Sequence, residues 1–206
     1  MFTTLAQVNP SLLRDGCFEV DAERSPITFQ TFNRREILPS YYQQNIWQIE
    51  SGVVRTLTWD ANGTVIPLGF WGKGDVVGYL LSEFSPYQVE CLTQVRVQKL
   101  SDSYVCSREM MLSHISQTQM LLKIVHTGSM EKRLLHFLLW MSKRFGYQME
   151  SGWRLDLRLT HLDIAEALGT TRVTVTRLLG QLQQEGVIQW SRREQILCDD
   201  SRLQQD

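Results

Sequence analysis

The chain has 206 residues, of which 43% are hydrophobic, and it carries a formal net charge of −1 at pH 7. This composition excludes a disordered chain and allows either one large globular domain or two small ones. Because the charge is close to neutral, binding of nucleic acid cannot be argued from the whole chain and has to be argued from local patches. No run of about 18 apolar residues is present, which excludes a membrane-spanning helix and a membrane partner.

The N-terminus and the cysteines indicate the compartment. Residues 1–16 lack a basic start followed by an apolar core, so we expect no signal peptide. The four cysteines, Cys17, Cys91, Cys106 and Cys198, are widely spaced and form no CxxC pair. We therefore expect free thiols in a reducing, cytoplasmic environment.

The first half of the chain has the pattern of a small β-domain. After a short leader (residues 1–26, with a helical pattern around 11–14), short runs with strand character follow one another up to Leu100. Their spacing and the turn signal at 60–63 (Asp-Ala-Asn-Gly) are typical of a β-sandwich or barrel. The expected strands are 27–32, 46–50, 53–59, 64–70, 87–92 and 95–100.

Near residue 105 the hydrophobic period changes from that of a strand to that of a helix. Met111, Ile115, Thr118, Leu122 and Val125 are spaced by four, three, four and three residues, which is a seam of about two heptads. The same face could pack on the β-domain or form a parallel dimer. We favour the dimer, because a two-fold protein suits a palindromic DNA site.

Two further elements lead into the C-terminal part of the chain. Residues 131–145 predict an amphipathic helix, and residues 153–157 predict a strand.

Residues 159–188 read as two short helices around a tight turn. Gly169 stands where a helix end needs a residue that tolerates positive φ, and Thr170 or Thr171 can cap the second helix. A set of apolar residues at helical spacing would be buried between the two helices. This set is Ile164, Ala165, Leu168, Val175, Leu178, Leu179 and Leu182.

The polar face of the second helix suits a DNA groove. Arg172, Thr174, Thr176 and Arg177 lie outside the apolar set, and no acidic residue occurs from 170 to 184. Arginine can bind guanine edges, and hydroxyl groups can contact phosphate. The alternative interpretation is an ordinary helical hairpin with a solvated polar face.

The residues that follow strengthen the DNA interpretation. Residues 187–190 and 195–197 have strand character and flank the basic turn Ser191-Arg192-Arg193-Glu194. We expect this hairpin to be a wing, with Arg192 and Arg193 lying along the phosphate backbone.

The sequence contains no pattern of an enzyme or of a bound metal. Nucleophile-elbow, HExxH and P-loop patterns are all missing, so we expect no enzymatic activity. There is no N-terminal cysteine cluster for an iron–sulfur site. His114 and His126 could be haem ligands, but a lone histidine on a helix is more often structural. We therefore expect no certain cofactor.

The succession of β-domain, long helix and winged helix-turn-helix resembles the CRP/FNR family of bacterial transcription regulators. The resemblance covers nearly the whole chain. It is strongest at residues 164–179, IAEALGTTRVTVTRLL, which are most similar to the recognition region of the global nitrogen-control regulators of that family. It implies an α+β fold with a double-stranded β-helix (a β-roll similar to cyclic-nucleotide-binding domains) at 1–105, a dimerisation helix at 106–127 and a DNA-binding domain at 128–206.

The resemblance also assigns roles within the DNA-binding domain. Arg172, Val173 and Arg177 would read base edges, while Thr160, Thr171 and Thr174 would hold phosphates. The family's catabolite activator has glutamate where Val173 stands. Valine can contact a thymine methyl group but cannot accept a hydrogen bond from cytosine. The implied target is a palindrome with GTA and TAC half-sites about one helical turn apart, and the implied protein partner is RNA polymerase.

Family members bind an effector in the β-roll, such as a cyclic nucleotide, 2-oxoglutarate, haem or an iron–sulfur cluster. Here Tyr87 stands where the phosphate-binding arginine is expected, which argues against a cyclic nucleotide because an anion loses its bidentate partner. Val77, Gly78, Tyr79 and Leu80 resemble the backbone-amide loop that holds the ligand of the nitrogen regulators. Binding of 2-oxoglutarate and a ligand-free β-roll that serves as a dimer scaffold both stay open.

Two other functions are compatible with the sequence. The protein could be a small-molecule sensor or adaptor whose winged domain contacts RNA polymerase or another regulator, in which case its affinity for DNA would depend little on salt. Alternatively, the protein could be an antagonist that competes with the nitrogen regulator for shared sites.

Overall fold

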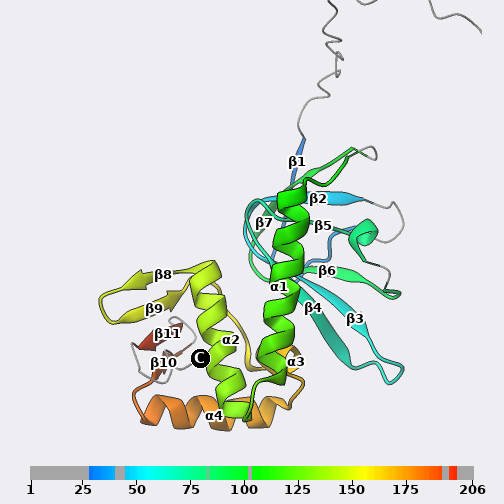
Figure 1. Cartoon of the computed structure of the whole chain (residues 1–206). Helices are drawn as coiled ribbons and strands as arrows, with labels where there is room; N and C mark the ends of the chain where they lie inside the picture. Colours follow the sequence, from blue (N-terminus) through cyan, green and yellow to red (C-terminus); the bar gives the residue numbers. More distant parts are fainter. Residues whose placement is uncertain (1–27, 40–44, 83, 102–103, 192–194, 199–206) are drawn as a thin grey trace, which may run out of the picture.

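The computed structural model describes residues 28–39, 45–82, 84–101, 104–191 and 195–198 (Figure 1). The expected leader, Cys17 and the wing residues Arg192 and Arg193 lie outside these residues. The described part has a β-roll, a long helix and a winged helix-turn-helix, so the α+β fold predicted from the sequence is confirmed. No helix among the described residues is long and apolar enough to cross a membrane.

The β-roll consists of two antiparallel sheets. One has the order β1-β7-β2-β5 and the other the order β4-β3-β6. Side chains from both sheets, among them Trp47, Val54 and Val89, are fully or almost fully buried between them. The strands are β1 (Phe29–Phe32), β2 (Ile46–Ser51), β3 (Val54–Trp59), β4 (Val65–Trp71), β5 (Val76–Gly78), β6 (Gln88–Cys91) and β7 (Val95–Lys99).

Six of these strands coincide with the runs expected from the sequence, whereas β5 was not expected as a strand. It has only three residues and no visible alternation, so its strand character comes from pairing with β2, with Val77 opposite Trp47. A 3₁₀ turn, Tyr79–Leu81, follows it. This segment was interpreted from the sequence as a ligand loop.

The long helix α1 (Arg108–His126) runs along the β-roll (Figure 1). Ser107 caps it by accepting a hydrogen bond from the amide of Met110, at 3.2 Å. The face that packs inward contains Leu121 and Ile124, which are buried, and His114, whose ring stacks on Trp71 at 3.9 Å.

The predicted seam lies on another face of α1. Met111, Ile115, Thr118 and Leu122 are exposed in the single chain, while Val125 is half-buried against the core. The alternative in which the whole seam packs on the β-domain is therefore wrong for Met111, Ile115 and Leu122, whereas Thr118 borders a cavity beside the β-roll. The packed residues are shifted along the helix by one position, which rotates the inward face away from the seam.

The C-terminal part begins with α2 (Met130–Phe145), close to the helix expected at 131–145. The strand expected at 153–157 is β9 (Gly152–Leu155), and it pairs with β8 (Gly146–Met149), which was not expected. They belong to a four-stranded sheet of order β10-β11-β9-β8. The remaining elements are α3 (His161–Leu168), α4 (Arg172–Gln184), β10 (Ile188–Trp190) and β11 (Gln195–Cys198).

The β-roll and the C-terminal part share one apolar core. Val53, Phe70 and Leu92 of the β-roll belong to the same buried cluster as the helices of the C-terminal part. The ring of Phe70 meets Phe137 edge-on at 5.6 Å and Trp140 at 6.0 Å. Within the chain, the helix-turn-helix is thus packed directly on the β-roll around α2.

Candidate nucleic-acid interface

Local sequence signals explain the helix-turn-helix. Thr160 caps α3 in a capping box, in which its hydroxyl accepts from the amide of Asp163 at 3.1 Å and the Asp163 carboxylate accepts from the amide of Thr160 at 2.8 Å. Gly169 ends α3 in the left-handed conformation, with φ of 63°. Of the two candidate caps, Thr171 caps α4, and it does so by accepting from the amide of Thr174.

The apolar set predicted for this segment is buried, and the polar face is free. All seven residues of the set are at most 5% exposed. On the other side of α4, Arg172, Val173 and Arg177 are exposed, and Val173 is 78% exposed. Val173 therefore lies on the same exposed face of α4 as the two arginines.

The threonine hydroxyls have roles in the protein itself. The hydroxyl of Thr160 donates to Asp163, that of Thr171 is paired with Thr174 at 2.9 Å, and that of Thr176 donates to the carbonyl of Arg172. Thr170 is half-buried in the turn and donates its amide to the carbonyl of Ala165. These hydroxyls therefore hold the starts of α3 and α4 in place.

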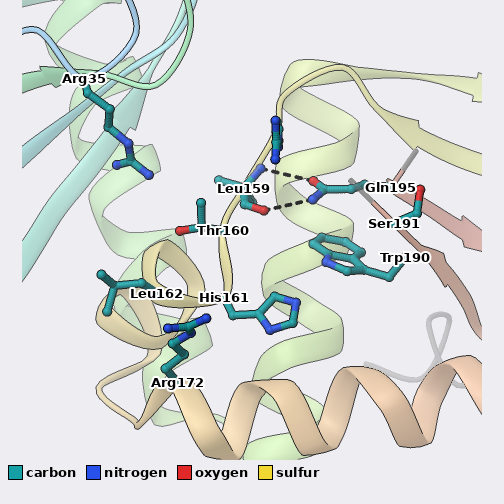
Figure 2. Close-up of a pocket in the computed structure, with 10 residues that line it drawn as sticks. Arg35, Leu159, Thr160, His161, Leu162, Arg172, Trp190, Ser191 and Gln195 are labelled. Atoms are coloured by element: carbon teal, nitrogen blue, oxygen red, sulfur yellow. Dashed lines mark hydrogen bonds between the residues drawn. The ribbon is translucent and has the colours of Figure 1, made fainter. Parts of the chain in front are cut away.

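A cleft of about 770 Å³ lies beside the start of α4 (Figure 2). Three arginines line it, namely Arg35 from the β-roll, Arg158 from the segment before α3, and Arg172 at the start of α4. None of its described lining residues is acidic, but Arg35 is ion-paired with Glu90 and Asp163, so the positive charge of the cleft comes mainly from Arg158 and Arg172. The other residues are Leu159, Thr160, His161, Leu162, Trp190, Ser191 and Gln195.

His161 connects the two helices within this cleft. Because the Thr176 hydroxyl donates to Arg172, it accepts from Nδ1 of His161, at 2.8 Å, and this leaves Nε2 unused by that contact. Burial and the positive charge of Arg172 lower the pKa of His161. The side chain is therefore mainly neutral near pH 7.

Residues of the wing form another wall of the cleft. The side-chain amide of Gln195 on β11 accepts from the amide of Leu159 at 3.2 Å and donates to its carbonyl at 2.9 Å (Figure 2). This pair fixes the segment before α3 to the wing. Trp190 and Ser191 continue the wall of the cleft, while Arg192 and Arg193, next in the sequence, lie outside the described residues.

Of the residues that line the cleft, sequence reasoning assigned only Thr160 and Arg172 to DNA binding and missed, among others, Arg35, Arg158, His161 and Trp190. Arg158 and His161 flank the predicted phosphate contact Thr160, and Trp190 was seen only as part of a strand, so local signals existed for these three. Arg35 lies more than a hundred residues before the recognition helix, and no local pattern connects it with DNA.

The residues predicted to bind an effector do not form a single surface. Val77 is 1% exposed and its side chain belongs to the β-roll core, which corrects its assignment to a ligand loop. Gly78 is the last residue of β5 and pairs with Ile46 of β2. Tyr87 is itself buried, and burial raises its pKa. Tyr79 meets the Tyr87 ring edge-on, and Leu80 lies in the 3₁₀ turn.

A cavity of about 260 Å³ lies between the β-roll and α1. Thr118, which was predicted in the dimer seam, lines it together with His114, and burial lowers the pKa of His114. Among the residues that the structure describes, no arginine, lysine or carboxylate lines this cavity. Its other residues are Thr56, Leu68, Trp71, Leu81, Ser82, Phe84 and Tyr87.

Comparison with known proteins places this architecture in a family. Residues 132–205 match the model of the Crp-like helix-turn-helix domain. Over 155 residues, or 74% of each chain, the sequence is 45% identical to the regulatory protein CysR of Synechococcus elongatus. The chain belongs to the CRP/FNR family of transcription regulators.

Other members of the CRP/FNR family agree with this assignment. The global nitrogen regulator of Synechococcus elongatus is 27% identical over 190 residues, which is 82% of this chain and 85% of the relative. The crystal structure of a CRP-family regulator from Thermus thermophilus has the same fold, with a TM-score of 0.73 at 22% identity over 85% of this chain and 94% of that one. The chain is thus a DNA-binding transcription regulator of this family, and its relatives are regulators and not enzymes.

Proposed function

We propose that this regulator binds a palindromic DNA site as a homodimer, with α4 in the major groove and the arginine-lined cleft on the adjacent backbone. The observation that carries the proposal is the exposed face of α4. Arg172, Val173 and Arg177 point away from the core, and Arg172 also lines a cleft whose described residues include no acid.

In this proposal, side chains of α4 contact the base edges. An arginine guanidinium can donate two hydrogen bonds to the O6 and N7 atoms of guanine, and the valine methyl groups can pack on the methyl group of thymine. These preferences support the GTA and TAC half-sites. The cleft binds the DNA backbone, and in it Arg158 lies beside Thr160 and the start of α3, while Arg35 is paired with Glu90 and Asp163.

The exposed stripe of α1 supports a dimer. Met111, Ile115 and Leu122 are 53%, 51% and 57% exposed, although each is a large apolar side chain. The opposite face of α1 already packs on the β-roll, so this stripe is free for another helix. A second copy of the chain offers the same stripe at the same heptad spacing, as a parallel coiled coil requires.

The side chains that line the β-roll cavity support the proposal that the protein binds DNA without an anionic effector. A cyclic nucleotide or 2-oxoglutarate carries negative charge, and the described lining of the cavity presents no cationic side chain except the imidazole of His114, whose pKa is lowered. Tyr87, which stands at the expected arginine position, is buried and carries no positive charge. We propose that the β-roll serves here as a scaffold.

Contact with RNA polymerase, which membership of the family implies, belongs to the same proposal. Competition with a nitrogen regulator is a second candidate. It is favoured by the 44% identity to the global nitrogen regulator of Synechocystis over 82 residues, or 40% of this chain and 36% of the relative.

The test is binding of the purified chain, without ligand, to a duplex with GTA and TAC half-sites, beside a scrambled duplex. We expect specific binding that weakens steeply with salt, because phosphate contacts release counterions. Arg172→Ala is expected to lose about 1–3 kcal/mol of binding free energy and much of the preference for the correct base at its position.

Arg96→Ala is the matched control, since Arg96 is an exposed arginine of β7 that lies over Phe29 and outside the cleft. It removes the same charge and should leave base preference unchanged. Affinity that hardly changes with salt would favour the adaptor function, and an unchanged base preference in Arg172→Ala would refute the assignment of that residue.

A further inference from the structure

A buried cluster of charges joins the β-roll to α3. Arg55 on β3 has a side chain only 6% exposed, and three carboxylates surround it. Its Nε lies 2.6 Å from Glu90, and its Nη1 lies 2.6 Å from Glu166 and 3.4 Å from Asp163. Glu90 belongs to the β-roll, whereas Asp163 and Glu166 belong to the first helix of the helix-turn-helix. Arg55 therefore spans the boundary between the two parts.

A second arginine reaches the same carboxylates from a strained turn. Arg35 has a left-handed backbone, with φ of 73°, and its amide donates to the carbonyl of Cys91 at 2.7 Å. Its side chain contacts Glu90 at 3.1 Å and Asp163 at 2.9 Å. An arginine keeps this unfavourable backbone conformation only where the surrounding contacts enforce it, and such strain is concentrated at functional positions.

The cluster acts on the end of α3 that faces the cleft. Oδ2 of Asp163, which accepts from Arg35, is the same oxygen that accepts from the amide and hydroxyl of Thr160 in the capping box. Nearby, Arg34 donates to the carbonyls of Leu92, at 2.9 Å, and Arg158, at 3.0 Å. The start of α3 is thus tied to the β-roll through side chains and through backbone.

We infer that Arg55 and Arg35 are positioning residues for DNA binding, which hold the helix-turn-helix on the β-roll in the orientation that a two-half-site duplex requires. The inference rests on the proposed function.

The different energetics of apolar contacts and of buried ion pairs support this positioning role. The apolar contacts of Phe70 with Phe137 and Trp140 already supply adhesion, but apolar packing alone tolerates sliding. Buried ion pairs add little net stability, because desolvation offsets their attraction, yet they demand one geometry. Arg55 stands opposite Glu90 on a central strand, so the partners on the β-roll side are rigid.

The consequence for a dimer is a fixed distance between recognition helices. α4 follows α3 after the turn at Gly169, so a rotation of α3 on the β-roll moves Arg172 and Arg177. Two half-sites one helical turn apart accept only one separation of the two helices. The cluster should therefore control how strictly the protein discriminates spacer lengths.

The experiment compares the full chain with Arg55→Met on three kinds of duplex: the palindrome, palindromes with one base pair added or removed between half-sites, and a single half-site. For the unchanged chain we expect a clear optimum in spacing. For Arg55→Met we expect about tenfold weaker binding to the optimal palindrome, a flattened spacing preference, and unchanged affinity for the single half-site.

Further variants separate positioning from folding. Glu166→Gln keeps the shape of a half-buried partner and should flatten the spacing preference in the same direction even if Arg55→Met does not fold. Arg96→Met removes a β-roll arginine outside the cluster and should leave the preference intact. A lower melting temperature with an unchanged spacing preference in both cluster variants would show a merely structural role and overturn the inference. Tighter binding of the palindrome by Arg55→Met would also overturn it, because the cluster would then hold the wrong orientation.

A readout without DNA keeps the inference testable if the unchanged chain binds no duplex. Spin labels at the exposed positions Lys73 and Gln183 report the distance between the β-roll and α4, after replacement of the native cysteines and dilution with unlabelled chain. We expect a narrow distance distribution that broadens in Arg55→Met. If the unchanged chain binds no DNA but the distance distribution broadens in Arg55→Met, only the proposed function is refuted. If the distribution is unchanged in Arg55→Met, the positioning role is refuted.

Discussion

The conformations and orientations of single residues in the helix-turn-helix follow from local chemistry. Gly169 takes the backbone conformation that its lack of a Cβ allows, and Thr171 caps α4 because its hydroxyl is within reach of the amide of Thr174. The same reasoning identifies Arg172 and Val173 as outward-facing, because they fall between the apolar positions of α4. Residue-scale predictions succeed here because each depends on neighbours within one or two helical turns.

His114 is a residue whose role depends on distant neighbours. Its ring stacks on Trp71, its Nε2 lies 2.7 Å from the carbonyl of Val76, and burial lowers its pKa below the ordinary value of 6.5. The structural interpretation of this histidine agrees with these contacts.

The lowered pKa of His114 predicts a dependence of stability on pH. Below pH 6.5 the unfolded chain binds a proton at this residue more readily than the folded chain does, so stability should fall with falling pH. Above pH 6.5 both states are neutral and the contribution is constant. The free energy of unfolding, measured at pH 8 and pH 5, should drop less in His114→Gln than in the unchanged chain. Equal drops in the two proteins would show that His114 does not contribute.

At the scale of elements, α1 shows the limit of hydrophobic patterning. Its inward face includes His114 and Gln117, while its outward face carries the larger apolar side chains Met111, Ile115 and Leu122. In an isolated sequence the more apolar stripe is expected to face the core. The inward orientation instead comes from Trp71 and the cavity of the β-roll, which accommodate a polar face.

The outward stripe gives a prediction for the helix as a unit. Leu122→Glu should produce a monomer, since two carboxylates facing each other in a dimer seam would repel and lose water. The oligomeric state is measured by sedimentation, and binding to the two-half-site duplex should fall with it. Ser116→Glu introduces the same charge at an exposed position of α1 outside the stripe and should stay dimeric. A dimeric Leu122→Glu protein would show that the copies meet elsewhere.

At the scale of the whole molecule, the β-roll and the DNA-reading part behave as one packed body within the chain. They share the core around Phe70, the pair Arg144–Asp75 and the charge cluster around Arg55. The described lining of the cavity near α1 lacks the fixed charges that an anionic effector needs. Coupling between sensing and DNA binding, which other family members obtain from a ligand, is here replaced in our proposal by fixed contacts.

Ligand independence predicts the response of the folded protein to candidate effectors. A ligand at a hundred times its dissociation constant stabilises the folded state by about 2.7 kcal/mol. We expect 2-oxoglutarate and cyclic nucleotides at millimolar concentration to leave both the melting temperature and the affinity for the palindrome unchanged. The palindromic duplex itself should raise the melting temperature and serves as positive control. A rise with either small molecule would contradict a scaffold role.

By itself, the sequence determined the succession of strands, long helix and helix-turn-helix, the buried and exposed faces of α4, and Gly169 at the end of α3, while it left Thr170 and Thr171 open as the cap of α4. These features depend on periodicity and on neighbours close in the chain. Only the tertiary structure decided that β5 and β8 are strands, that α1 turns its more polar face inward, that Val77 and Tyr87 are buried, and that Arg35 and Arg55 reach α3. The reason is physical: strand pairing, burial and ion pairs between residues a hundred positions apart depend on which surfaces meet, and local sequence carries no information about that meeting.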